Sequence, residues 1–513
     1  MKRDLLQPLP TPLRDAVERE WRRLEVENEL LKQEVRRLRM AKYGVKSDQL
    51  SEEQLSLLDE EPGVVGAEVD GEVGRSEQEK QNVARQTKQP RQHPGRAELP
   101  ANLERIESIL ACTPEQCRCA QCGGEKKLIG YDTSEELDVK PAQYFVNVIK
   151  REKRACGRCE EMGVSTAVAP QPKIVEKGKA SNAVIVDVVL KKYCDYLPLY
   201  RQCAILERET GMVLSRMTLC GWVMQAGTWL EAVCDAMRVD LLAGPYIQAD
   251  ETPVGVQSER SVGKNHTSYL WQYSRPGGPV IFDFQMGRSR EGPASFLGQF
   301  AGVLQSDGYA AYDKIGGQGI VHAGCMAHVR RGFVDAIKLS PGNASAGAIV
   351  ARIAQLYAVE QRAREAAMPA DQRQRLRQTE SAPTLKELKK QIVDLRRDVL
   401  PQSAFGKACH YAMAQWSRIE VYVNHGEVEI DNNWCENAMR PVALGRKNWL
   451  HIGSEEAGPR IAAITSVIET CRRLKINVRE YLLDVLPRIP TWPAKRVAEL
   501  TPMAWAAQRS SRK

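Results

Sequence analysis

The sequence predicts a multidomain α/β protein, and three observations lead to that prediction. The 513-residue chain is longer than a single average hydrophobic core supports. Short β-like runs concentrate between residues 246 and 331, whereas helical patterns dominate before and after that section. Two closely spaced cysteine pairs lie upstream of both patterns. We therefore expect a mixed core at residues 241–450, with helical and metal-binding modules around it.

Composition and charge set broad limits on function. The 73 Lys and Arg outnumber the 65 Asp and Glu, and the net charge of +8 is compatible with a polyanionic partner without establishing one. No apolar run approaches the roughly 18 residues that a membrane span needs. The charged, proline-rich N-terminus lacks the apolar core of a signal peptide. We therefore expect a cytoplasmic protein without a membrane partner.

Residues 1–61 carry the heptad spacing of a coiled-coil helix. The pattern alternates in steps of four and three residues and comprises Val17, Trp21, Leu24, Asn28, Leu31, Val35 and Leu38. A lone asparagine at an a position sets register and strand number in parallel coiled coils, so the pattern favours a homodimer. The alternative is a single amphipathic helix that packs on its own domain.

Residues 62–99 have the composition of a flexible linker. They are rich in Gly, Glu, Gln, Arg and Pro and contain no aromatic residue. The second half, ARQTKQPRQHPGR, is basic and could lie along phosphates, although such stretches are more often solvated tethers.

Residues 100–170 form a cysteine-bearing module. Four thiolates from two C-x-x-C pairs can close a tetrahedral shell around a structural Zn²⁺, and here the ligands would be Cys119, Cys122, Cys156 and Cys159. The intervening residues 135–156 alternate like paired strands, so we expect an elongated zinc ribbon. Cys117 could compete with Cys119 as a ligand. The alternative is a set of reduced core cysteines.

Residues 171–240 are expected to form a helical domain with helix-turn-helix spacing. A first helix meets Gly211 as a turn signal, and Ser215 can cap a second helix that runs to about residue 224. The side chains expected to pack between the helices are Leu206, Met212 and Leu219. Arg216 would then lie near the start of a DNA recognition helix. The same geometry also occurs in helical bundles that bind no DNA.

Two aspartates in the β-rich section follow apolar runs, at places where the end of a strand would present an acid. Asp250 follows YIQA, and Asp307 follows FAGVLQS. Carboxylates on one sheet can share divalent cations, and two cations about 3.5–4 Å apart support in-line phosphoryl displacement. This chemistry needs a third carboxylate from elsewhere in the chain. Glu251 alternates to the opposite face of its strand and is the weaker ligand.

Helical patterns return after the β-rich section. The stretch of about 340–420 is charged and strongly helical. In the region 451–513, apolar positions recur at helical spacing, namely Ile461, Ile464, Ile468 and Cys471. We therefore expect a helical interruption of the core and a helical C-terminal region.

The motifs ADETP, SDGYAAYD, CMAHVRRGF and DNNWCENAMRPVALGRKNWL follow one another in this order. Together they closely resemble the DDE transposases of bacterial insertion sequences, and specifically the large catalytic subunit of the insertion-sequence-sixty-six family. The resemblance extends from the N-terminal heptads through the cysteine module to the final YLLDVLPRIPTWP and AELTPMAW. Each motif alone is common, but the combination is specific.

The resemblance implies a ribonuclease-H-like catalytic core, interrupted by an all-helical insertion before its last acid. Carried over by position, the catalytic acids are Asp250, Asp307 and Glu436, which would hold two Mg²⁺ ions. The first two are 57 positions apart and the last two 129. The helical stretch of about 340–420 lies in the longer interval, as an insertion requires.

Further residues of these motifs are implied to support the site. Cys325 and His328 form a C-x-x-H signature that several such transposases carry after the second acid, with the implied role of organising the site near the DNA. Met326 departs from the aromatic residue expected there. The alternative is a core thiol and a helix-capping imidazole. Cations that would meet phosphates or pair with acids are Arg330, Arg331, Arg440, Arg446 and Lys447.

The segment EIDNNWCENAMRP has a local alternative for each acid. Asp431 or Asn433 can cap a helix, and Asn433 with Glu436 has capping-box spacing. With the resemblance, Glu436 becomes the third metal ligand on the first turn of a helix, and Arg440 lies one turn further on the same face. Glu429 is expected to face solvent.

The implied function is a transposase that binds the ends of its own element in double-stranded DNA. It would hydrolyse DNA at each end to free a 3′-hydroxyl and join that hydroxyl to target DNA. A homodimer or larger synaptic assembly would bring two ends together, and small accessory proteins of the same element could assist. The rivals are a DNA-binding protein without catalysis and a junction resolvase, which cuts branched DNA without joining it.

Overall fold

The structure is a computed structural model of the 513-residue chain. It describes residues 11–43, 117, 121, 124–125, 131, 144–155, 164–167, 172–176, 178, 180–259, 264–340 and 342–510. The chain divides into two compact units, Val83–Ala167 and the rest of the chain. No helix within the described ranges is long and apolar enough to span a membrane.

In the unit Val83–Ala167, the described strands form a short hairpin. Strand β1 (Lys153–Ala155) pairs antiparallel with β2 (Val164–Thr166). Residues 144–152, which we expected in paired strands, have no regular secondary structure, and Phe145 is 80 % exposed. The predicted strand pairing is therefore wrong for this stretch, because alternation produces a strand only where neighbouring strands pack against its side chains.

Two predictions fall on residues that the structure does not describe. The four zinc ligands Cys119, Cys122, Cys156 and Cys159 lie outside the described residues, as does the linker at 62–99. The second cysteine pair belongs to the part of the sequence between β1 and β2. The zinc ribbon stays a prediction.

In the larger unit, the N-terminal heptads lie on one helix, α1 (Thr11–Tyr43). Its large apolar heptad side chains are 42–58 % exposed, and they are Trp21, Leu24, Leu31, Val35 and Leu38. An apolar stripe at heptad spacing is what a coiled coil covers with its second strand. The helix is confirmed, and dimerisation stays a prediction.

Three helices precede the sheet, namely α4 (Asn182–Tyr193), α5 (Leu199–Thr210) and α6 (Arg216–Leu242). Gly211 ends α5 in the left-handed conformation with φ of 69°, and the Ser215 hydroxyl accepts a hydrogen bond from the Thr218 amide at 3.1 Å. The predicted turn and cap are therefore present. Leu206 and Leu219 are buried as predicted, but Met212 is 48 % exposed.

The exposed Met212 and the length of α6 are two departures from the predicted helix-turn-helix. Met212 belongs to the extended connection between α5 and α6, so it does not reach the core between them. Helix α6 continues to Leu242, well past residue 224, because its apolar face keeps packing: Leu230, Val233 and Leu241 are fully buried.

A mixed sheet forms the centre of the unit. Its strands are β3 (Tyr246–Val256), β4 (His266–Ser274), β5 (Val280–Gln285), β6 (Val303–Gln305) and β7 (Val321–Ala323), in the order β5-β4-β3-β6-β7, and β8 (His451–Ile452) also pairs with β3. β3, β4 and β5 are antiparallel neighbours, whereas β3, β6 and β7 run parallel. Strands β3 to β7 all lie within residues 246–331, where the sequence predicted short β-like runs.

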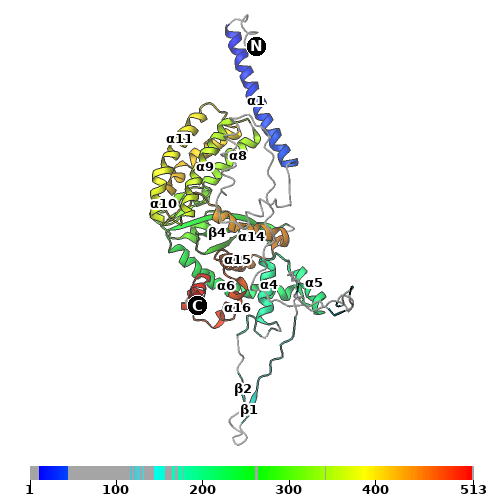
Figure 1. Ribbon diagram of the computed structural model, residues 1–513. Coiled ribbons are helices and arrows are strands. Elements are labelled where there is room, and N and C mark those ends of the chain that lie inside the picture. Colours follow the sequence, from blue (N-terminus) through cyan, green and yellow to red (C-terminus); the bar gives the residue numbers. More distant parts are fainter. Residues whose placement is uncertain are drawn as a thin grey trace. The chain divides into compact units, whose positions relative to one another are not determined.

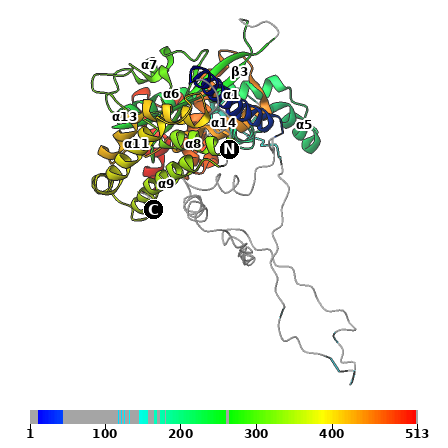
Figure 2. The ribbon, with the colours of Figure 1, turned by 90° about the horizontal axis from the view of Figure 1, so that it is seen from above.

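Helices cover both sides of this sheet (Figure 1). The stretch between β7 and residue 424 is almost entirely helical and comprises α8 (Met326–Leu339), α9 (Ala344–Glu365), α10 (Ala370–Leu376), a π-helix (Arg377–Ser381), α11 (Ala382–Arg396), α12 (Ala404–Ala414), α13 (Trp416–Ile419) and a 3₁₀ turn (Glu420–Asn424). Figure 2 shows α8, α9 and α11 next to one another. The predicted helical interruption is therefore present.

The helical interruption shares one hydrophobic core with the sheet. Phe333, Ile353 and Leu388 from its helices belong to the same buried cluster as Tyr246 and Val303 from β3 and β6. Within it, Arg377 and Glu360 form a fully buried ion pair at 2.6 Å. The inserted helices are therefore continuous with the sheet's packing.

The C-terminal part begins with α14 (Asn433–Trp449) and continues with α15 (Ala457–Arg473), α16 (Val478–Val485), two 3₁₀ turns (Ile489–Thr491 and Ala494–Leu500) and α17 (Pro502–Ser510). The four α15 positions predicted at helical spacing are all buried. The α15 hydroxyls of Ser466 and Thr470 accept the amides of Phe282 and Val280 at 2.7 and 2.9 Å. Helix α15 thereby supplies hydrogen-bond acceptors for backbone amides on the outer side of the edge strand β5.

Candidate active site

The register of the sheet brings the two predicted aspartates level with each other. β3 and β6 run parallel, with Gln248 opposite Gln305. Two residues further along the chain come Asp250 and Asp307. Because side chains alternate between faces with a period of two, Asp250 lies on the face of Gln248, and Asp307 comes just beyond the end of β6. The 57 positions between the aspartates in the sequence equal the register offset of their strands.

Asp250 lies inside β3, not at its end as the sequence predicted. The strand continues to Val256 because β4 pairs with it along that whole length. The Asp250 carboxylate accepts a hydrogen bond from the Glu251 amide at 2.8 Å. Burial, together with the carboxylates of Glu251, Glu436 and Asp307, raises the pKa of Asp250 to about 8, although that hydrogen bond acts to lower it.

Asp307 follows β6 in a tight turn. Its carboxylate accepts the Tyr309 amide at 2.8 Å, and its carbonyl accepts the Tyr411 hydroxyl at 2.7 Å. Gly308 between them has φ of 90°, and a Cβ there would lie 2.6 Å from the Gln415 side chain. Only glycine fits this position, so the turn and its acid are fixed by main-chain geometry.

Glu436 approaches the aspartates from the first turn of α14, as predicted. Its Oε2 pairs with Arg331 Nη2 at 3.2 Å, while its Oε1 lies 3.6 Å from His328 Nδ1. The charge of Glu436 contributes to the raised pKa of Asp250, and both Glu436 and Asp307 act on His328. The charges of Asp307 and Glu436 therefore both reach Asp250.

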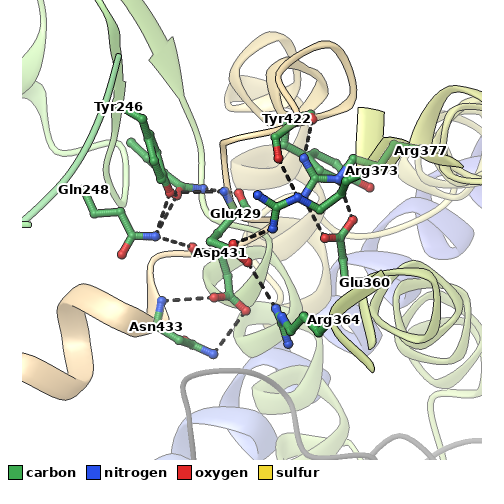
Figure 3. A network of polar contacts seen from close by, with 12 residues as sticks. Tyr246, Gln248, Glu360, Arg364, Arg373, Arg377, Tyr422, Glu429, Asp431 and Asn433 are labelled. Carbon is green, nitrogen blue, oxygen red and sulfur yellow. Dashed lines mark hydrogen bonds and ion pairs between the residues drawn. The ribbon is translucent and has the colours of Figure 1, made fainter. Parts of the chain in front are cut away.

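Arginines of the inserted helices form ion pairs with the segment before α14 (Figure 3). Glu429 pairs with Arg373 at 2.7 Å and with Arg364 at 3.3 Å. Its side chain is 16 % exposed. Burial would raise the pKa of Glu429, but the two guanidinium groups hold it below the ordinary value. The expectation that Glu429 faces solvent is therefore wrong, because its partners come from helices far upstream in the sequence.

The sheet holds the other side of the same segment. Gln248 donates to the Asp431 carbonyl at 2.9 Å and accepts the Cys435 amide at 3.0 Å. Gln305 donates to the Glu429 carbonyl at 2.8 Å. Because Gln248 shares the face of Asp250, the sheet orients the start of α14 toward that face. Figure 3 shows Gln248 and Tyr246 beside this segment.

Asp431 and its neighbouring asparagines form the turn into α14. Asp431 is 2 % exposed, and its carboxylate accepts the Asn433 amide at 3.0 Å and the Asn433 side-chain amide at 3.1 Å. Burial raises the pKa of Asp431 to about 6. Asn432 occupies the N-cap position, so the alternative of a capping box between Asn433 and Glu436 is absent. The predicted role of Asp431 in a turn that aims Glu436 fits this geometry.

Cys325 and His328 lie at the start of α8, beside Glu436. Cys325 is the N-cap residue of α8, and its sulfur accepts a hydrogen bond from the Asn432 amide at 3.2 Å. One ligand atom each of Cys325, His328 and Glu436 lie within 4.8 Å of one another. Burial raises the pKa of Cys325 well above its ordinary value and lowers the pKa of His328. The structure thus brings the C-x-x-H signature next to the third acid.

The predicted cations have different positions. Arg331 contacts Glu436, as described above, and Arg446 Nη1 donates to the Thr252 hydroxyl at 3.2 Å. Arg330 belongs to α8, and Arg440 and Lys447 belong to α14, the two helices that carry His328 and Glu436. Arg216 is exposed at the first residue of α6.

A second polar cluster, on the opposite side of β3, was not predicted. Glu251 accepts two hydrogen bonds from Arg288, one of them from Nε at 2.9 Å, and one from the Tyr312 hydroxyl at 2.8 Å. The Arg288 guanidinium lies 3.9 Å from the centre of the Tyr309 ring. Strand alternation does place Glu251 away from Asp250, but its partners are distant in sequence and carry no local signal.

Comparisons with known sequences agree along the chain. Residues 177–460 match the sequence model of the transposase IS66 family, and residues 116–160 match that of the zinc-finger binding domain of transposase IS66. Residues 466–503 match the IS66 C-terminal element, and residues 30–107 match a model described as transposase C of IS166 homeodomain.

Two similar proteins come from Sinorhizobium fredii (strain NBRC 101917 / NGR234), and both carry the description of uncharacterized protein. The chain is 34 % identical to y4jD over 430 residues, which cover 80 % of this chain and 82 % of y4jD. It is 32 % identical to y4qI over 487 residues, which cover 91 % of this chain and 87 % of y4qI.

Proposed function

The chain belongs to the transposase IS66 family, and we propose that it catalyses DNA cleavage and joining for an insertion sequence. It would hydrolyse DNA at the ends of its element to free 3′-hydroxyls and transfer these to target DNA. The observation that carries this proposal is the arrangement of Asp250, Asp307 and Glu436, where two register-matched aspartates meet a helix-borne glutamate.

The topology of the sheet supports a ribonuclease-H-like core. Three antiparallel strands, β5, β4 and β3, continue into the parallel strands β6 and β7, and α8 follows directly. The helices between α8 and α14 would be the insertion that such a core carries before its last acid. Asp250 lies on β3 and Asp307 follows the parallel neighbour β6, which supports their proposed roles as first and second acid.

The chemistry of the three acids fits divalent metal ions. Three carboxylates near one another repel, and the pKa of Asp250 near 8 means that its charged form is disfavoured without a cation. Asp250, Asp307 and Glu436 would hold two Mg²⁺ ions, which when bound activate the attacking oxygen and stabilise the leaving one. Hard carboxylate oxygens are the ligands that Mg²⁺ prefers.

The chain's own residues would orient this reaction. The main-chain hydrogen bonds to Asp250 and Asp307 keep both carboxylates from rotating away. Arg331 on Glu436 would meet a backbone phosphate while it steadies the carboxylate. Arg446 contacts Thr252 of β3, two residues beyond Asp250. A second phosphate contact there would fix the direction of the bound DNA strand.

DNA binding would come from the N-terminal modules. The α5–α6 pair has helix-turn-helix order with Arg216 exposed at the start of the second helix. A zinc ribbon built on Cys119, Cys122, Cys156 and Cys159 would supply a second contact to the ends. The heptad stripe of α1 would join two copies, so that two ends meet in one assembly.

Strand transfer in vitro tests the proposal. A purified full-length chain, Mg²⁺ and a donor duplex with a 3′-hydroxyl element end should give joined products, and Asp250→Asn should give none. Equal inactivity of both proteins, with end binding intact, would favour a DNA-binding protein without catalysis. Cleavage of branched DNA without joining would instead indicate a junction resolvase.

A further inference from the structure

The cluster of Cys325, His328 and Glu436 has the composition of a second metal site. Its donor atoms are a sulfur, an imidazole nitrogen and a carboxylate oxygen, all within 4.8 Å of one another. Sulfur and imidazole are ligands that Mg²⁺ avoids and Zn²⁺ prefers. The two proposed Mg²⁺ ions therefore do not account for this set of donors.

Two atoms of the cluster are buried and unsatisfied. Among the described residues, neither His328 Nδ1 nor Glu436 Oε1 has a hydrogen-bond partner, although both atoms are inaccessible to solvent. They lie 3.6 Å apart, which is too long for a hydrogen bond but suits two ligands of one ion. Buried polar atoms normally have partners, and one shared ion would supply a partner to both atoms.

We propose that Cys325, His328 and Glu436 bind a transition-metal ion of the Zn²⁺ class through Sγ, Nδ1 and Oε1. Binding would release the thiol proton to solvent and leave a thiolate on the ion. The ion, one thiolate and one carboxylate then sum to zero charge, which suits a partly buried position. Three protein ligands leave a fourth position open to water or phosphate.

The site shares Glu436 with the proposed catalytic centre, and the following consequence rests on that proposed function. Oε1 faces the Cys325–His328 side, and Oε2 is already paired with Arg331. An ion of the Zn²⁺ class would therefore hold Glu436 away from Asp250 and Asp307. Micromolar Zn²⁺ would inhibit cleavage by competition for this carboxylate, against millimolar Mg²⁺.

Cobalt binding tests the site without DNA or activity. The metal-free full-length chain first receives one equivalent of Zn²⁺, which the four-cysteine ribbon would take, and Co²⁺ is then titrated. We expect a further equivalent of Co²⁺ to bind with a thiolate-to-cobalt charge-transfer band. That band should vanish in Cys325→Ser, whose hydroxyl still accepts the Asn432 amide, and affinity should fall at least about tenfold in His328→Gln.

Cys409→Ser is the matched control, because Cys409 is a buried cysteine on α12 outside the cluster. It should keep the band. A band of equal strength in wild type and Cys325→Ser, or no further equivalent in wild type, would overturn the site. If the serine variant does not fold, His328→Gln tests the site instead, and wild-type Co²⁺ affinity in that variant would overturn it.

Inhibition then tests the shared carboxylate. The Zn²⁺ concentration that halves Mg²⁺-dependent strand transfer should rise at least about tenfold in Cys325→Ser and stay unchanged in Cys409→Ser. An equal Zn²⁺ sensitivity of wild type and Cys325→Ser would overturn the competition. A chain that binds Co²⁺ at Cys325 but transfers no strand would leave the site standing and contradict the proposed function instead.

Discussion

The sheet-borne acids and the helix-borne acid are held in different ways. Asp250 lies on β3, Asp307 follows the adjacent parallel strand β6, and both accept hydrogen bonds from nearby backbone amides. Glu436 depends on side chains, because the segment before it is clamped between Arg364 and Arg373 on one side and glutamines of the sheet on the other.

This difference assigns the inserted helices a part in the site. Asp250 is held by the sheet, and Asp307 also accepts the Tyr411 hydroxyl of the insertion through its main-chain carbonyl. Only the segment before Glu436 pairs with Arg364 and Arg373, so a change at these two arginines should affect Glu436 and leave Asp250 and Asp307 in place. The following experiments test whether Glu436 is held differently from Asp250 and Asp307.

The largest effect is expected from Glu436→Gln, which keeps the size of the side chain and removes its charge. DNA cleavage should fall by about 10³-fold, since a group that stabilises charge in the transition state is lost, while binding to element ends stays at the wild-type level. The measurements are 3′-end release on a gel and end binding by fluorescence anisotropy.

Glu427→Gln is the control for that change, because Glu427 lies in the same segment and is 36 % exposed. It should cleave like wild type. Near wild-type cleavage by Glu436→Gln would remove the third acid from the account.

Glu429→Ala should lower the free energy of unfolding by about 3 kcal/mol, because it leaves the partly buried guanidinium groups of Arg364 and Arg373 without their shared carboxylate. Urea denaturation measures this loss. Glu380→Ala, which breaks an exposed pair with Arg362 in the same insertion, should cost at most about 1 kcal/mol. Equal losses in the two variants would mean that the clamp is an ordinary surface pair.

Gln248→Met should cost about 2 kcal/mol, because it leaves the Asp431 carbonyl and the Cys435 amide unsatisfied in the interior. It should also reduce cleavage, since the start of α14 loses its anchor on the sheet. The control is Gln285→Met, because the Gln285 side chain donates to Asp283 of the same strand, β5. This variant should cleave normally. If both variants cleave alike, the sheet does not orient Glu436.

A pH dependence of the stability is expected from Asp250. Its pKa rises from 3.8 to about 8 on folding, so between these values the folded chain keeps a proton that the unfolded chain has lost. Stability without divalent ions should therefore fall as pH rises from 4 to 8, by up to about 1.4 kcal/mol per pH unit.

Asp250→Asn isolates that contribution, because asparagine does not titrate. Thermal denaturation across pH 5–8 should give a shallower slope for this variant, while Asp431, with its pKa also raised, contributes equally to both proteins. Identical slopes would show that Asp250 titrates normally in the folded chain.

Much of the sheet and its acids could be predicted from the sequence. Strand alternation separates Asp250 from Glu251, and the cap signals of Gly211 and Ser215 are local, so both are readable along the chain. The motif order added Glu436, whose local pattern alone indicates a helix cap. These features depend on neighbours within a few residues or on a recognisable motif.

What failed depends on distant partners. Glu429 looked solvent-facing because the arginines that bury it lie 56 and 65 positions upstream. Met212 has the right spacing for a helix–helix core but lies in an extended connection. Asp250 was placed at a strand end because the pairing with β4 that prolongs β3 has no signal in the apolar run before it.

Anomalous diffraction from Mn²⁺-soaked crystals of the full-length chain tests the central claim most directly. If Asp250, Asp307 and Glu436 form one metal centre, the map should contain a manganese peak within ligand distance of all three carboxylates, and Glu436→Gln should weaken or displace it. Manganese that contacts none of the three acids, or only one, under conditions that support strand transfer would contradict the account.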